Sequence, residues 1–391
     1  SPVSDMARRC GRGGGGGGTA GGAMPRNALQ CLEVPLGAGS DTIQALAWTP
    51  LAGTNHVVCG SWDKQMRCYE VEQDGASGRP VAAHPMVATS LGGPVLDVAW
   101  REDGAAAFGG GCDGAVVMWD LKTGTTTQVA AHDAPVKSVE YLLNFGGLVT
   151  GGWDAKVRLW DCRQQTPTAE IGVSERVVSM SASQTADYPL LVVATADRLF
   201  HCYDVRNTAA PLLPPLKSQL EMQTRVVKVF GDGVGYASGS IGGRCAIRHN
   251  VWNGTGETPT SDPSKGDFTF KCHRIKSGAD NNIYSVNALA FHPQVANCIV
   301  TAGSDGSFHC WDKFLRKKCW KKNWTPSRQH LPIMCCDFNA NGDLLALGTG
   351  YDWSLGVDRA PTPEGFLLLQ HVTPDMVTAS SGDGGGGRRG R

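Results

Sequence analysis

The sequence predicts an all-β protein folded as a seven-bladed propeller. A short phrase recurs in which a small-residue turn with an Asp comes six or seven residues before an aromatic-acidic pair, as in Gly152-Trp153-Asp154 before Trp160-Asp161. Seven triplets of short strand-like runs follow one another. The first triplet covers residues 42–48, 56–62 and 65–71. Gly, Pro, Asp or Asn bounds each run, as at the ends of strands.

The recurring phrase is typical of the WD40 repeat, in which each repeat supplies one blade of a propeller. Blades of about 40–45 residues would occupy most of this 391-residue chain as one ring. A propeller usually serves as a platform that holds other molecules. The repeats therefore favour a binding function over catalysis. The phrase starts at Gly60, Gly111, Gly151, Thr195 and Gly303.

Three segments divide the chain. We expect residues 1–26 and 373–391 to be disordered Gly/Arg-rich tails, because their composition cannot form a core. Residues 27–372 form the propeller. Two polar insertions, 253–267 and 351–364, depart from the regular spacing and are expected in loops that carry binding.

The ring needs a fourth strand for its last blade. Residues 30–34, Gln-Cys-Leu-Glu-Val, precede the first triplet and have strand character. We predict that they pair with blade seven and close the ring, because closure removes the exposed sheet edges of an open array.

Composition limits the classes of partner. Lys plus Arg equals Asp plus Glu at 36 each, which argues against bulk electrostatic binding of nucleic acid but leaves room for a local basic patch. The 14 cysteines are scattered without paired CxxC motifs, so we expect buried reduced thiols and no metal site. No run approaches the about 18 apolar residues of a membrane helix, so no membrane partner is expected.

One set of side chains invites a catalytic interpretation. His132, Thr150 and Asp154 could suggest hydrolase chemistry. In a WD40 blade, however, these residue types together with Trp160 form a buried hydrogen-bond chain that ties the blade together. We therefore expect a structural tetrad, no catalytic residue, no cofactor and no enzymatic activity. The other turn aspartates, expected to act alike, are Asp63, Asp113, Asp197 and Asp305.

A basic stretch stands out in this neutral chain. Six of the ten residues at 313–322 are cationic, and Phe314, Leu315 and Trp320 are interleaved with them. The stretch is interpreted either as a solvated edge strand or as a docking surface for an acidic peptide or phosphate.

Several longer phrases are distinctive: PVLDVAW (94–100), HDAPVK (132–137), GSIGGR (239–244), FTFKCHR (268–274) and YDWS (351–354). Over about residues 27–372 the chain resembles, through these phrases, the WD40 mRNA export factor family of the nuclear pore. Members of that family bind the GLEBS motif of an FG-repeat nucleoporin. The mitotic-checkpoint WD40 proteins, which bind GLEBS-like motifs of checkpoint kinases, share the GSxxGR and FKCHR-type phrases and are the closest alternative.

The resemblance implies an elongated peptide across one face of the propeller. Arg244 matches the arginine that pairs with a ligand carboxylate, and Trp62 matches an aromatic residue on the same face. Gly242 stands where the family usually has an acidic residue, and Trp320 where a basic residue is more usual. A further contact surface for peptides and nucleic acid is matched by Phe270, Trp311, Asp312, Lys313, Arg316 and Lys318.

These expectations define a scaffold that binds a GLEBS-type nucleoporin peptide, supports mRNA export and contacts RNA or messenger ribonucleoprotein. The alternative is a spindle-checkpoint scaffold that docks kinases at kinetochores, with mitotic partners. A substrate receptor of a ubiquitin ligase is a third, less favoured class. The export hypothesis predicts that the protein is located in the nucleus and at the nuclear pore, and also in the cytoplasm.

Overall fold

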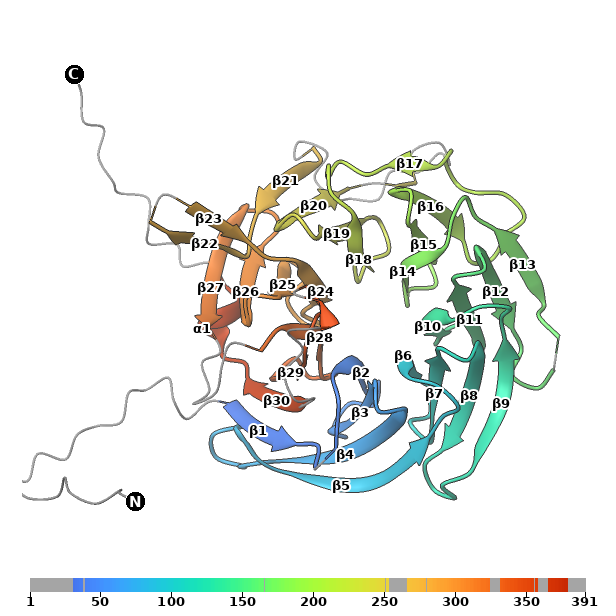
Figure 1. Ribbon diagram of the computed structural model, residues 1–391, viewed down its shortest axis with the longest axis horizontal. Helices are drawn as coiled ribbons and strands as arrows, with labels where there is room; N and C mark the ends of the chain where they lie inside the picture. The colour runs from blue at the N-terminus through green and yellow to red at the C-terminus, as the bar shows by residue number, and fades with distance from the viewer. Residues whose placement is uncertain are drawn as a thin grey trace, which may run out of the picture.

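The computed structural model describes residues 31–37, 39–164, 166–249, 251–252, 266–278, 280–323, 331–354, 356–357 and 365–378. Seven four-stranded antiparallel sheets surround a central axis, with the first strand of each nearest the axis and the fourth at the rim (Figure 1). The seven-bladed all-β fold predicted from the repeats is therefore confirmed.

Each predicted triplet supplies the three inner strands of one blade, and the segment after it supplies the rim strand in blades one to six. Blades one to four are β2 (Ile43–Trp48), β3 (His56–Ser61), β4 (Gln65–Gln73), β5 (Pro80–Ser90); β6 (Val95–Trp100), β7 (Ala106–Gly111), β8 (Ala115–Asp120), β9 (Thr126–Ala131); β10 (Val136–Leu142), β11 (Gly147–Gly152), β12 (Lys156–Trp160), β13 (Ala169–Gly172); and β14 (Val177–Ala182), β15 (Leu190–Thr195), β16 (Leu199–Asp204), β17 (Leu216–Lys217). Blades five to seven are β18 (Thr224–Val229), β19 (Tyr236–Ser240), β20 (Arg244–Arg248), β21 (Phe268–Lys271); β24 (Val286–Phe291), β25 (Cys298–Gly303), β26 (Ser307–Asp312), β27 (Lys317–Asn323); and β28 (Ile333–Phe338), β29 (Leu344–Thr349), β30 (Phe366–His371), β1 (Cys31–Pro35).

The first strand of the chain closes the ring, as predicted. β1 pairs antiparallel with β30, with Cys31 opposite Gln370 and Pro35 opposite Phe366. Blades seven and one then share an apolar cluster that includes Ile43, Leu344 and Leu367, all fully buried. Closure therefore joins the two ends of the propeller through a sheet and a core together.

Each innermost strand carries one β-bulge at the same place, near its first residue. In all seven blades the pairing register skips one residue, for example between Val136 and Ser138. A bulge re-aims the side chain of its extra residue. The seven extra residues line the cavity along the propeller axis and form what we call the bulge ring. Its members are Gln44, Leu96, Lys137, Val178, Arg225, Asn287 and Met334.

A two-stranded hairpin outside the blades was not predicted. β22 (Arg274–Ser277) and β23 (Asp280–Ile283) pair with each other between blades five and six, around Gly278 at φ 63°. The segment is polar and lacks the apolar alternation that marks a strand buried on one face. Its strand pairing therefore leaves little trace in the sequence.

The end of the propeller also differs from the expected boundary at residue 372. A short helix, α1 (Pro374–Val377), follows the last blade and buries Met376 and Val377 against the core of blades six and seven. These two apolar residues explain why the packed part continues to Thr378. The expected N-terminal tail and residues 379–391 lie outside the described residues, as does most of both predicted insertions.

Two further findings concern composition. The thirteen cysteines that the structure describes are all free thiols, and eight of them are buried. In the same residues, the structure contains no helix with the length and apolar character needed to cross a membrane.

Candidate functional site

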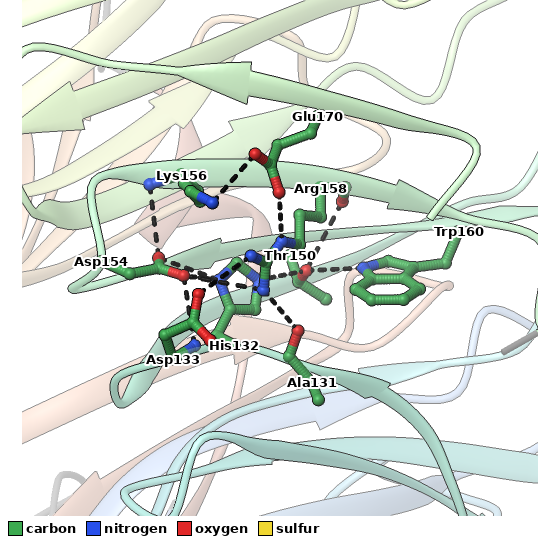
Figure 2. Close-up of polar contacts among 9 residues, drawn as sticks. All are labelled: Ala131, His132, Asp133, Thr150, Asp154, Lys156, Arg158, Trp160 and Glu170. Carbon is green, nitrogen blue, oxygen red and sulfur yellow. Dashed lines mark hydrogen bonds and ion pairs between the residues drawn. The ribbon is translucent and has the colours of Figure 1, made fainter. Parts of the chain in front are cut away.

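The four residues expected to form a tetrad lie together in blade three (Figure 2). His132 Nδ1 lies 3.0 Å from each carboxylate oxygen of Asp154, and its Nε2 lies 2.7 Å from Thr150 Oγ1. The carboxylate can only accept, so Nδ1 carries the proton and Nε2 accepts from the Thr150 hydroxyl. The Trp160 indole N–H donates to the same hydroxyl at 2.8 Å.

This arrangement suits a structural role. Thr150 is fully buried, and the His132 side chain is closed off from solvent, so no substrate carbonyl can approach the hydroxyl. Burial lowers the pKa of His132 despite the neighbouring Asp154 carboxylate, which keeps the imidazole neutral. Arg158 lies beside the tetrad, and its Nε–H donates a hydrogen bond to Glu170 Oε2 at 2.8 Å (Figure 2).

A second complete tetrad lies in blade six. His273 Nδ1 is 2.8 Å from Asp305, its Nε2 is 2.9 Å from Thr301 Oγ1, and the Trp311 indole donates to Thr301 at 3.1 Å. The His precedes the Thr and Asp by 28 and 32 residues here, against 18 and 22 in blade three. The ten extra residues are those of the hairpin 274–283, which hid the repeat from the sequence analysis.

Trp62 and Arg244 lie on one face of the propeller. The turns between second and third strands lie at the same end of every blade, and we call this end the upper face. Trp62 occupies that turn in blade one, where its indole donates to Gln44 Oε1 at 3.0 Å. Arg244 is the first residue of β20, directly after the corresponding turn of blade five. The expected shared face of these two residues is therefore present.

The turn before Arg244 is held by a side chain from the β22–β23 hairpin. The guanidinium of Arg274 donates to the carbonyl oxygens of Gly242 at 2.9 Å and Gly243 at 3.3 Å. Gly243 adopts φ 58°, a left-handed conformation that favours glycine. At Gly242 a Cβ would lie 2.8 Å from Met222 Cγ, so Met222 fills the space of a larger residue. Arg274 is therefore a positioning residue that sequence reasoning did not assign.

The other expected contact residues do not lie on the upper face. Asp312, Lys313 and Arg316 belong to the end of β26 and the turn after it, which joins a third strand to a fourth and so lies at the opposite, lower end of blade six. Phe270 and Lys318 lie on the rim strands β21 and β27. The predicted set thus divides between two separate surfaces.

Two of these residues are in the interior, which corrects the expectation of an accessible contact. Asp312 is 9% exposed, and its carboxylate accepts the backbone N–H groups of Phe314 at 2.8 Å and Leu315 at 2.7 Å, which shapes the turn. Lys313 is 4% exposed and lies 3.7 Å from the ring centroid of Phe230. A cation can be buried there because the aromatic face compensates part of its desolvation, and burial lowers its pKa.

Trp311 also has a structural role, because its indole N–H belongs to the blade-six tetrad. Its ring packs against Phe270, with 4.6 Å between the ring centroids, and the Lys318 ammonium lies 4.6 Å from the Trp311 ring centroid. The Arg316 guanidinium lies 4.4 Å from the Phe268 ring centroid. We call Phe268, Phe270, Arg316 and Lys318 the rim patch, a cationic and aromatic surface between blades five and six.

The upper face carries exposed apolar side chains that the sequence analysis missed. Trp153 and Ile241 occupy the same kind of turn as Trp62 and are 43% and 45% exposed. Met222 and Trp353 are 54% and 49% exposed on segments at the same end. Large apolar side chains in solvated turns mark interaction surfaces when they gather together. The sequence does carry a sign of this surface, because a Trp occupies the second position of the turns Ser61-Trp62-Asp63 and Gly152-Trp153-Asp154.

Some of these side chains lie at the upper opening of the axial cavity. The cavity measures about 540 Å³, and Trp62, Trp153 and Ile241 line its mouth. Arg176, directly before β14, and Arg225, the bulge residue of β18, line the same cavity. The upper face therefore combines aromatic anchors with guanidinium groups, the residue types that dominate protein–protein contacts.

Within the described ranges, no three His, Cys, Asp or Glu side chains lie close enough together to hold a metal ion. The polar clusters of blades three and six are satisfied internally by the hydrogen bonds given above.

The repeats and the seven-bladed ring define a WD40 propeller, and comparison with known proteins agrees: residues 124–161 and 268–312 match the WD domain, G-beta repeat family. The chain is 39% identical to Protein Rae1 of Drosophila melanogaster, over 84% of this chain and 90% of that protein. It is 38% identical to Poly(A)+ RNA export protein of Schizosaccharomyces pombe, over 85% and 88% respectively. The mRNA export factor of Xenopus tropicalis is 35% identical, over 92% and 95%. The chain belongs to this Rae1 and mRNA export factor family.

Proposed function

We propose that this protein is a non-enzymatic scaffold of mRNA export that holds a GLEBS-type nucleoporin peptide across its upper face. The names of its relatives support the export role and favour it over the checkpoint alternative. The observation that carries the peptide proposal is the upper face itself, where Arg244 follows a turn held by Arg274 and exposed Trp153, Ile241 and Met222 lie at the same end of the blades.

The contact chemistry follows from these side chains. A guanidinium forms bidentate, charge-assisted hydrogen bonds with a carboxylate of the peptide. The indoles and the Met and Ile side chains supply apolar area that loses water on binding. Such a surface suits a peptide that presents acidic and apolar side chains.

Calorimetric titration of a synthetic GLEBS peptide tests the proposal, with the wild-type chain compared with Arg244→Glu. We expect binding by the wild type and a loss of roughly a hundredfold or more in the variant, because a charge-assisted pair becomes a like-charge contact. Lys122→Glu is the matched control, since Lys122 is exposed in the lower turn of blade two. No binding by the wild type, or equal losses in the two variants, would reject the peptide proposal.

Localisation separates the export role from the checkpoint alternative. The proposed role places the protein in the nucleus and at the nuclear rim in interphase, with a cytoplasmic fraction. A diffuse nuclear signal with recruitment to kinetochores in mitosis would instead support the checkpoint role.

We further propose that the rim patch contacts RNA of the exported particle. Its support is the alternation of Arg316 and Lys318 with the rings of Phe268 and Phe270, because single-stranded nucleic acid binds through phosphate pairing and base stacking. Affinity for a single-stranded oligonucleotide should fall steeply with salt and fall again in Arg316→Ala/Lys318→Ala. A flat salt response would contradict direct RNA binding at this patch.

A further inference from the structure

The bulge ring includes charged side chains, and these line the axial cavity because the extra residue of each bulge points toward it. In blades three and five the extra residue is cationic, so Lys137 and Arg225 enter the axial cavity near its upper mouth. Arg176 joins them from the segment before β14, and Lys228 lies three residues further along β18. Four cations from three consecutive blades thus line one cavity.

These four cations have no close counter-ion in the part of the chain that the structure describes. None of them is within 4.0 Å of a carboxylate oxygen, the distance that defines the ion pairs found elsewhere in the molecule. At longer range Arg225 interacts with Asp352, and Lys137 interacts with Asp97. Lys228 is the best compensated of the four, because the carboxylates of Glu140, Asp337 and Asp97 raise its pKa. Burial nevertheless lowers the pKa of Lys137, so its charge is only partly compensated.

Two carboxylates also line the cavity, fewer than the four cations. Asp97 already accepts hydrogen bonds from the Val139 N–H at 2.8 Å and the Ser138 hydroxyl at 3.1 Å. Burial raises the pKa of Glu140 to about 7, so this group loses its charge near neutral pH. The cavity therefore carries an excess of positive charge, with Arg176 and Arg225 exposed at its mouth and Lys137 and Lys228 half-buried.

We propose that the mouth of the axial cavity is a binding site for a compact, free oligophosphate anion. Guanidinium forks match phosphate oxygens in geometry, and two Arg with two Lys offer more donors than a single carboxylate can use. A cleft with one dominant sign of charge and low-dielectric walls focuses its field on the ligand. A cavity of about 540 Å³ leaves room for a ligand with several phosphate groups. The site lies beneath the proposed peptide surface and does not depend on it.

The test is calorimetric titration of the full chain with inositol hexakisphosphate at low and moderate salt. The mouth variant is Arg176→Gln/Arg225→Gln, because both side chains are exposed and their loss should leave the core intact. The control is Lys122→Gln/Lys217→Gln, which removes the same charge from exposed positions outside the cavity. Melting curves establish that all three proteins are folded.

We expect the wild type and the control to bind alike, and the mouth variant to bind roughly tenfold or more weakly, since two charge-assisted contacts are lost. No binding by the wild type at millimolar ligand would overturn the proposal. So would equal weakening in both variants, because the ligand would then report net charge alone. Titrating the same wild-type preparation with the GLEBS peptide separates the two proposals: peptide binding without oligophosphate binding leaves the proposed function standing and removes this site.

Discussion

Replacing Thr150 by Val tests the tetrad as an element of stability. Valine has the shape of threonine but no hydroxyl, so two buried groups lose a partner: Nε2 of His132, at 2.7 Å, and the indole N–H of Trp160, at 2.8 Å. A buried polar group without a partner costs about 1–3 kcal/mol. We expect the free energy of unfolding to fall by about 2–4 kcal/mol, because larger losses from one substitution are rare.

The chain contains an internal reference for this prediction. In blade two, Gly109 stands at the sheet position of Thr150, and the indole N–H of the buried Trp119 has no partner among the described residues. One unsatisfied indole is therefore tolerated in this fold. A second, together with an unsatisfied imidazole, should nevertheless be measurable.

Urea denaturation followed by tryptophan fluorescence and circular dichroism gives the free energy of unfolding, provided that both probes report one transition. Thr127→Val is the control, since Thr127 is exposed on a rim strand and should stay within about 0.5 kcal/mol of wild type. A Thr150→Val protein within that same range would refute the claim that the hydrogen-bond chain holds the blade together.

Three further predictions follow from the site. The imidazole of His132 should titrate below the ordinary value of about 6.5, because burial lowers its pKa. The stability that the neutral imidazole contributes is then complete above about pH 6.5 and is lost as the pH falls through the lowered pKa. A nitrogen-15 chemical shift that titrates at or above pH 6.5 would contradict the buried neutral form. Oligophosphate affinity should rise as pH falls from 8 to 6, because protonation of Glu140, which faces Lys228, Asp97 and Asp337, removes a negative charge. In Glu140→Gln that rise should disappear, leaving only the fall in affinity that protonation of the ligand's phosphates causes, and an unchanged slope would exclude Glu140 as the source of the rise. Arg274→Ala should weaken GLEBS peptide binding several-fold without unfolding the chain, because it frees the turn before Arg244; unaltered calorimetric affinity would show that the turn holds its shape alone.

Much of the fold is predictable because each blade repeats one local pattern. Alternating apolar residues, turn glycines and the Asp of the turn fix strands and connections within about 40 residues. The closing strand was predictable as well, because Cys31–Pro35 has strand character and the last blade lacked a partner. Blade three revealed its tetrad because His132 keeps the regular spacing.

The missed features depend on relations between segments. The bulge ring exists only in the pairing of neighbouring strands, and nothing in the local sequence marks Lys137 or Arg225 as an extra residue. Lys313 was expected on the surface because lysines are rarely buried, yet the ring of Phe230, far away in the chain, supplies the surface on which it rests. The hairpin 274–283 displaced His273 from the regular spacing and concealed the second tetrad.

The pairing of β1 with β30 has a consequence for biosynthesis. The strand that completes the last blade is synthesised before the rest of the propeller, and its partner β30 is synthesised after all the other blade strands. Until that partner emerges, β1 has no sheet to join and the facing surface of blade one stays uncovered. Contacts between such distant segments form slowly, and open sheet edges promote misassembly during synthesis. The nascent chain is therefore expected to need protection by chaperones until β30 has been synthesised.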